Sequence, residues 1–426
     1  MTRRSLPPPL PADDDFLVPA PGFAAAAAGS VLRSRRVELG VFGGVRLPQR
    51  AWQVQYRTAD HTGAPQTSVA TLILPRGALP GPRPLMSYQC AIDSLSPRSF
   101  PSYALRRGAR SYGSATRWEL LVVGMALARG WAVVVPDHEG ASGNWGVPRE
   151  AGYCALDAIR AARAFAPFGV GPQDPTVLFG YSGGGLATAW AAELQPSYAP
   201  ELELAGAVLG SPVGHLRNTF LRLSAGPFGG LALAVVAGLH RGYPDFRADL
   251  DANTVPQVQE LIAGAPAYST LGAVTRFRGF DPQSVLTIPL DEFLSRPSQV
   301  AMFADIEPGT AAPSCPLLVV QAVHDQIISV DDVDRLVATY RRLGATVDYV
   351  RDEASEHVTA LVLSVTSSLD WLAARMAARP AGDRTRSTVL AVRPRVWRGL
   401  LRHGAVVVEA ACGRGIGPRR RTHPGA

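Results

Sequence analysis

A serine between glycines is the clearest chemical signal in this chain of 426 residues. Gly180-Tyr-Ser182-Gly-Gly184 fits the pattern G-x-S-x-G, which places a nucleophilic serine on a sharp turn between a strand and a helix. An apolar run at 177–179 enters the turn, and a run of mostly small residues at 185–190 leaves it. Because both flanking elements are indicated, we predict that Ser182 is a nucleophile and not part of an ordinary glycine turn.

A serine nucleophile needs a histidine that takes its proton and a carboxylate that orients the histidine. With this motif the order along the chain is serine, acid, histidine. Of the eight histidines, only His357, His403 and His423 lie far enough after Ser182, and the last two fall in a basic C-terminal segment. We predict His357 as the base; the alternative is a surface histidine at a helix start.

For the acid, Asp325 comes directly after an apolar strand-like run at 317–322, where a loop would present a carboxylate. Asp331, Asp332 and Asp334 compete, but they lie in the first turn of a predicted helix, where Asp complements the helix dipole. We therefore predict Asp325.

The oxyanion of an acyl-transfer intermediate also needs hydrogen-bond donors. The amide of Gly183, next after the nucleophile, is predicted to supply one of them. We expect the second in the loop after the strand that ends near Tyr88 and Gln89.

Strand and helix patterns alternate along most of the chain, which predicts right-handed crossovers and a mostly parallel sheet covered by helices on both faces. We therefore predict an α/β fold of the hydrolase type, with a helical cap. The predicted segments are strands at 52–56, 68–74, 85–89, 131–136, 176–180, 204–209, 317–322 and 346–350, and helices at 118–129, 150–165, 331–343 and, last, 358–376.

The alternation breaks for about 100 residues, and this break predicts an inserted cap over the carboxyl ends of the strands, where ligands of such sheets bind. Four apolar cap residues are candidates to line an acyl tunnel, although cap core explains them equally well: Phe220, Phe228, Leu231 and Leu233. The predicted units are a leader (1–45), a first core part (46–210), the cap (211–312), a second core part (313–379) and an Arg-rich tail (380–426).

The net charge is +7, and the tail carries ten Arg against Asp383 and Glu409, so the remaining chain is about neutral. We expect this tail to be solvated and partly disordered. An alternative hypothesis is that the tail, with Trp397 and Leu400-Leu401, holds the protein on anionic lipid. Nothing else resembles a nucleic-acid module, and no apolar run approaches the roughly 20 residues of a membrane span.

Cysteines at 90, 154, 315 and 412 are widely spread, which disfavours a zinc site and leaves one or two disulfides open. No metal or organic cofactor is implied, and oligomeric state has no signature in the sequence.

Several of these segments together resemble the secretory lipases of the fungal lipase A type, from about residue 30 to about 376. The resemblance implies a lipase whose triad is Ser182, Asp325 and His357 and whose oxyanion hole is formed by Asp93 and Gly183. An ionised Asp93 would repel an oxyanion, so either its backbone amide donates or burial keeps its side chain protonated. The resembling segments are Ser87-Tyr-Gln89 with Asp93, Pro136-Asp-His-Glu-Gly140, the serine motif with Ala187-Thr188, Ser197-Tyr-Ala-Pro-Glu-Leu202, Gly226-Pro-Phe228, Val285-Leu-Thr287, His324-Asp-Gln-Ile-Ile328 and Glu356-His-Val-Thr-Ala360.

Two positions depart from the family pattern: Phe100 and Arg342 stand where it has disulfide cysteines. The chain as written starts without an apolar export segment, which favours a cytoplasmic location, whereas the resemblance implies secretion.

The function predicted from the sequence is hydrolysis of acylglycerols or other lipid esters through an acyl-enzyme, with a lipid or other ester as the partner. The alternatives are acyl transfer by the same triad and a non-catalytic binding scaffold. The scaffold is disfavoured because it has no need to keep all three triad residues.

Overall fold

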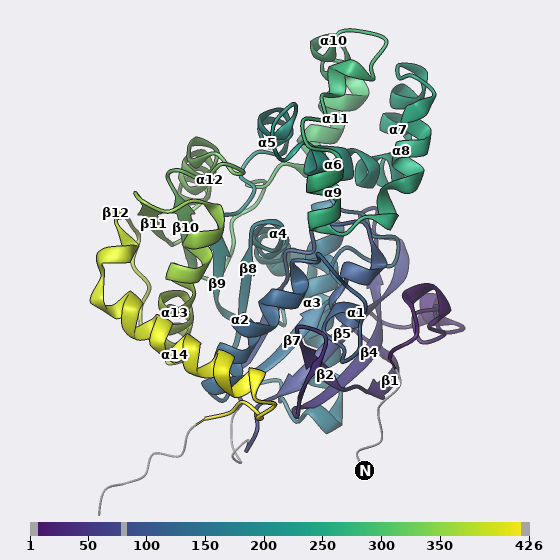
Figure 1. The fold of residues 1–426 in the computed structure, drawn as a ribbon. Coiled ribbons are helices and arrows are strands. Elements are labelled where there is room, and N and C mark those ends of the chain that lie inside the picture. Colours follow the sequence, from purple (N-terminus) through teal and green to yellow (C-terminus); the bar gives the residue numbers. More distant parts are fainter. Residues whose placement is uncertain (1–6, 78–82, 419–426) are drawn as a thin grey trace, which may run out of the picture.

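A ten-stranded, mostly parallel sheet forms the centre of the computed structural model, which describes residues 7–77 and 83–418 (Figure 1). The strand order is β1-β4-β5-β7-β6-β8-β9-β10-β11-β12. Strands from β7 to β12 in this order are parallel to their neighbours, whereas β1, β4 and β5 join antiparallel at one edge. The predicted α/β-hydrolase fold is confirmed.

Most predicted strands agree with the structure to within about three residues. The observed strands are β1 (Val31–Arg36), β2 (Leu39–Val41), β3 (Val45–Leu47), β4 (Arg50–Ala59), β5 (Pro65–Leu74), β6 (Leu85–Gln89), β7 (Ala132–Pro136), β8 (Thr176–Tyr181), β9 (Leu204–Gly210), β10 (Leu317–Ala322), β11 (Val347–Asp352) and β12 (Arg384–Thr388).

Helices cover both faces of the sheet, which explains why the central strands are apolar without alternation. On β8, Leu178 packs in the core on one face, and Val177 and Phe179 pack in the core on the other. The first core includes residues of α3, α4 and α12, and the second includes residues of α2, α13 and α14. The helices outside the cap are α1 (Pro101–Ala104), α2 (Thr116–Ala128), α3 (Pro148–Ala164), α4 (Gly183–Tyr198), α12 (Val330–Arg342), α13 (His357–Met376) and α14 (Pro394–Ala411).

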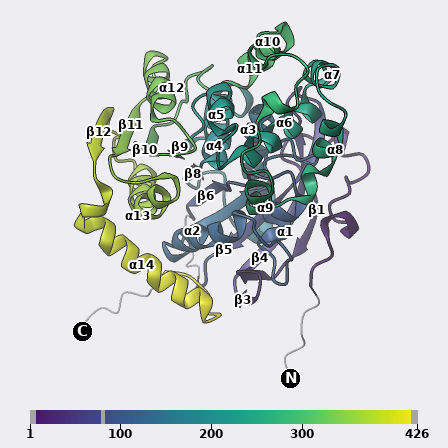
Figure 2. The same ribbon diagram turned by 45° about the horizontal axis from the view of Figure 1, so that its top comes forward.

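Between β9 and β10 the chain leaves the sheet and forms a group of helices beyond the carboxyl edge of the strands (Figures 1 and 2). A third apolar core holds these helices together. They are α5 (Leu216–Leu223), α6 (Gly229–Gly242), α7 (Pro244–Ala252), α8 (Gln257–Gly264), α9 (Thr270–Arg276), α10 (Leu290–Leu294) and α11 (Pro297–Ile306).

The later part of the predicted leader forms strands. β1 pairs with β4 at the edge of the sheet, and β2 forms a hairpin with β3. Arg35 of β1 forms an ion pair of 2.6 Å with the buried Asp14, and this contact holds the segment around Asp14 against β1. Because β1 is an arginine-rich edge strand that is only partly buried, it lacks the apolar pattern by which strands are predicted.

The tail, which we expected to be solvated and partly disordered, contains a strand and a long helix within the described residues, which end at 418. β12 adds to the sheet beside β11, and α14 packs against α2 and α13. The inward side of α14 is formed by small or apolar residues, Val396, Gly399, Val406 and Ala410. The high arginine content of this segment hid the apolar pattern of the inward side, because the arginines occupy other sides of the helix.

One helix of the described chain, α13, is long and apolar enough to cross a membrane by length and composition, and half of it is buried in the protein. It packs on the sheet through Val365, Leu369 and Leu372, as a core helix does. All four cysteines are free thiols, so the disulfides left open by the sequence are absent.

Candidate active site

Ser182 occupies a strained turn between β8 and α4. Its backbone has φ 56° and ψ −123°, and its amide donates to Gly210 O at 2.8 Å. A side chain at Gly184 would overlap Gln89 O, and one at Gly180 would overlap Gly184 O. The glycines of the motif therefore allow the close approach of strands and helix that holds the serine in this conformation.

Three side chains that lie far apart in the sequence form one hydrogen-bonded chain. His357 Nε2 is 2.9 Å from Ser182 Oγ, and His357 Nδ1 is 2.7 Å from Asp325 Oδ2. All three residues are buried, at 7 % exposure for Ser182, 2 % for Asp325 and 6 % for His357. The arrangement permits a proton to pass from serine to imidazole while the carboxylate holds the ring.

The loop after β10 holds Asp325 as an ionised acceptor. Its Oδ1 accepts from the amides of Ile327 and Ile328, each at 2.8 Å. Burial by itself would raise the pKa of Asp325, but the hydrogen bond and charge of His357 bring it below its ordinary value.

Ser211 is a further member of this group that the sequence analysis missed. It is fully buried after β9, its Oγ donates to Asp325 Oδ2 at 2.6 Å, and it lies 3.2 Å from His357 Nδ1. Its φ of 39° is unusual for a residue other than glycine. A signal did exist, because Ser211 follows a strand at the same carboxyl edge of the sheet as Ser182 and Asp325.

His357 is the first residue of α13, and two contacts fix this end of the helix. Glu356 caps it by accepting from the amides of Val358 and Thr359 at 3.0 and 2.8 Å. The Tyr181 hydroxyl donates to His357 O at 2.5 Å. The competing carboxylates Asp331 and Asp332 lie in the first turn of α12, as expected. Asp334 lies beyond that turn, contrary to expectation, and its Oδ1 accepts from the Tyr349 hydroxyl at 2.7 Å.

Asp93 and Gly183 lie side by side beside the serine. Gly183 is the first residue of α4, so its amide has no acceptor within the helix. Asp93 adopts a positive φ of 44°, and a methyl group on Gly183 would overlap Asp93 Oδ1. Burial raises the pKa of Asp93 to about 6, although the charge of His357 opposes the rise. A protonated Asp93 could donate to an oxyanion.

An almost wholly apolar cavity opens next to Ser182. It is lined by Phe220 and Leu231 among the predicted cap residues, but not by Phe228, which packs in the cap core. Trp145, which the sequence analysis missed, also lines it, and its Nε1 lies near Gly183. Trp145 lies in a glycine-rich loop whose sequence has no pattern that marks a site residue.

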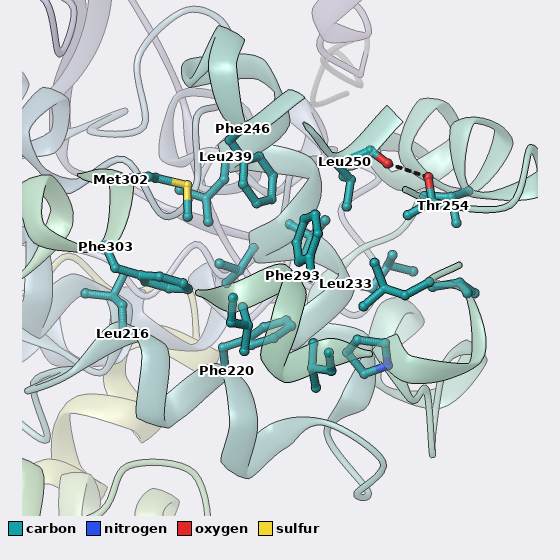
Figure 3. A pocket seen from close by; sticks show the side chains of 18 of the residues that line it. Leu216, Phe220, Leu233, Leu239, Phe246, Leu250, Thr254, Phe293, Met302 and Phe303 are labelled. Carbon is teal, nitrogen blue, oxygen red and sulfur yellow. Dashed lines mark hydrogen bonds between the residues drawn. The ribbon is translucent and has the colours of Figure 1, made fainter. Parts of the chain in front are cut away.

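A second apolar cavity lies inside the cap (Figure 3). Phe293, Met302 and Phe246 point into it, and the predicted Leu233 lines it. Leu216, Phe220 and Val235 line both cavities, so these three side chains form the wall between the serine and the interior of the cap.

The sheet, the serine turn and the order of the three side chains along the chain define an α/β-hydrolase. The pattern of the secretory lipase family matches residues 105–384, and the chain belongs to this family.

Relatives support the family, and a solved structure supports the fold. The chain is 45 % identical over 420 residues to a protein of Mycobacterium tuberculosis named a probable inactive lipase, covering 98 % of this chain and 94 % of that protein. It is 31 % identical to lipase A of Arthroderma benhamiae, covering 97 % and 90 %. The closed-state structure of Candida antarctica lipase A superimposes with a TM-score of 0.85 at 24 % identity, covering 97 % and 99 %, which supports the fold.

Proposed function

We propose that the protein hydrolyses carboxylic esters with apolar acyl groups through a covalent acyl-enzyme on Ser182. The observation that carries the proposal is the unbroken hydrogen-bonded chain from Ser182 Oγ through both nitrogens of His357 to Asp325. One relative carries the name of an inactive lipase, but a name does not alter the geometry of this chain, where all three groups are within hydrogen-bond distance.

In the first half of the reaction, His357 Nε2 removes the Ser182 proton while Oγ attacks the ester carbonyl carbon. The resulting oxyanion is stabilised by the Gly183 amide and by a donor from Asp93. When the intermediate collapses, the bond to the alcohol oxygen breaks, and the alcohol leaves with the proton held on His357.

In the second half, His357 removes a proton from water, and the hydroxide oxygen attacks the acyl carbon. Collapse of the second intermediate releases the carboxylic acid and returns the proton to Ser182 Oγ. Asp325 keeps its charge throughout and stabilises the imidazolium in both halves.

The two apolar cavities favour a long acyl group over a short one. Almost every side chain lining them is apolar, and Phe220, Leu216 and Val235 line both. A rotation of these side chains would join the cavities into one path that leads from Ser182 into the cap. Each buried methylene contributes about 0.8 kcal/mol, so affinity should increase with chain length.

The test is a series of p-nitrophenyl esters from acetate to palmitate, assayed with wild type and with Ser182→Ala. We expect kcat/KM to rise with acyl length and to fall at least about 1,000-fold in the variant. Ser197→Ala is the matched control, because Ser197 is an exposed serine near the end of the same helix.

Labelling with a fluorophosphonate distinguishes an inactive protein from an unsuitable ester. Stoichiometric labelling of wild type, lost in Ser182→Ala, shows an activated serine. Equal hydrolysis by wild type and Ser182→Ala, with no labelling of either, would contradict the proposal.

A further inference from the structure

The outward side of α14 carries an apolar stripe that no part of the described chain covers. Trp397, Leu401 and Val408 are 55 %, 76 % and 61 % exposed. Their spacing of i, i+4 and i+11 places them within about 40° of one another around the helix axis. The opposite side of α14 is the one packed on α2 and α13, and at the edge of the stripe Trp397 Nε1 donates to Ala391 O at 2.7 Å.

A row of arginines runs beside the stripe. Arg395, Arg398 and Arg402 are exposed and spaced i, i+3 and i+7, so they follow one side of the helix. None of the three forms an ion pair within the described part of the chain. The sequence that follows adds Arg414 and three consecutive arginines at 419–421.

We propose that this face of α14 docks on an anionic lipid surface. Aromatic and aliphatic side chains beside arginines suit the boundary between acyl chains and negatively charged headgroups. A second copy of the chain docked symmetrically through the same face would oppose two rows of positive charge, which disfavours a dimer. A phosphate backbone would pair with the arginines but would leave the adjacent aliphatic stripe without a partner.

The docking face is separate from the cavity beside Ser182. Figures 1 and 2 both show α14 along the periphery of the molecule, away from the cap helices. Docking therefore tethers the protein without closing the cavity. Variants on α14 should leave hydrolysis of a dissolved short-chain ester unchanged.

The test is co-sedimentation of the full chain with vesicles of phosphatidylcholine, or of phosphatidylcholine and phosphatidylglycerol at a ratio of seven to three. All proteins carry Ser182→Ala, so lipid is not consumed and the result does not depend on the proposed ester hydrolysis. We expect the partition coefficient to be much higher on the anionic vesicles and to fall as salt is added.

Two α14 variants test the arginine row and the stripe separately. R395Q/R398Q/R402Q should lower partitioning on anionic vesicles about 100-fold, because each arginine contributes a factor of about five and the three factors multiply. Leu401→Gln changes a single exposed side chain and should lower it several-fold. The matched controls are Trp118→Ala, which removes an exposed tryptophan on α2, and R110Q/R276Q/R278Q, which removes three exposed arginines elsewhere.

Equal partitioning of the unaltered α14 on both kinds of vesicle would overturn the proposal. So would controls that lose as much binding as the α14 variants, because the effect would then be one of total charge. A concentration-dependent dimer in sedimentation velocity that Leu401→Gln dissolves, without vesicle binding, would assign the face to a second copy and also overturn it.

Discussion

Replacing Gly183 by alanine should lower the activity of this protein without lowering its thermal stability. The added methyl group would lie 2.3 Å from Asp93 Oδ1, whereas ordinary van der Waals contact begins at 3.4 Å. The methyl group or the Asp93 side chain must therefore move by about 1 Å, and a displacement of this size in an active site can cost about 100-fold in rate. That loss corresponds to about 2.7 kcal/mol of transition-state stabilisation.

The fold should tolerate the same change. Gly183 is the first residue of α4 and is not among the residues with positive φ, so alanine fits its backbone. Alanine is favoured over glycine in a helix by up to about 1 kcal/mol, although less at the first position. We expect Tm to stay level or rise slightly while kcat/KM falls about 100-fold.

Kinetics on p-nitrophenyl esters and thermal unfolding monitored by circular dichroism provide the two readouts. Gly264→Ala is the matched control, because a methyl group there, at the end of α8, would meet nothing within 4 Å. Activity of Gly183→Ala within threefold of wild type would refute the reasoning that Asp93 must stay beside Gly183. A large drop in Tm would refute the claim that the fold tolerates the change.

Three further results are expected from the contacts at the site. Ser211→Ala and Ser211→Gly should both lower kcat about tenfold with little change in KM, because each removes a hydrogen bond to the charged Asp325; full activity of the glycine variant would show that the hydroxyl is dispensable. If Asp93 donates as a carboxylic acid, kcat/KM of wild type should fall relative to Asp93→Asn as pH rises through about 6, and a constant ratio from pH 5 to 8 would assign the donor to the backbone. Tm should be higher at pH 5 than at pH 8, because buried carboxyls with raised folded-state pKa values keep protons that the unfolded chain releases, so stability falls as pH rises through this window; a flat Tm would show that these groups are solvated. Burial raises the pKa of four carboxyls to about 7: Glu119, Asp137, Glu150 and Glu307.

The sequence by itself determined the central sheet. Buried parallel strands must be apolar on both faces, and in the helices between them apolar residues must recur every three to four positions. The sequence also named Ser182, Asp325 and His357, since each stands at the end of a strand-like run and their order along the chain suits one reaction. These signals are local, and a single segment contains each of them.

Only the tertiary structure decided what depends on contacts between distant segments. Ser211 joins the site only through its hydrogen bond to Asp325, which is 114 residues away. Serine is a common residue, so its type alone does not mark it as part of a site. The wall between the two cavities is made where α5 meets α6, and apolar periodicity cannot distinguish a cavity wall from a packed core. β1 and α14 were not predicted because their many arginines hide the apolar pattern of a strand or helix. Their order comes from neighbouring elements: β1 pairs with β4, and α14 packs on α2 and α13.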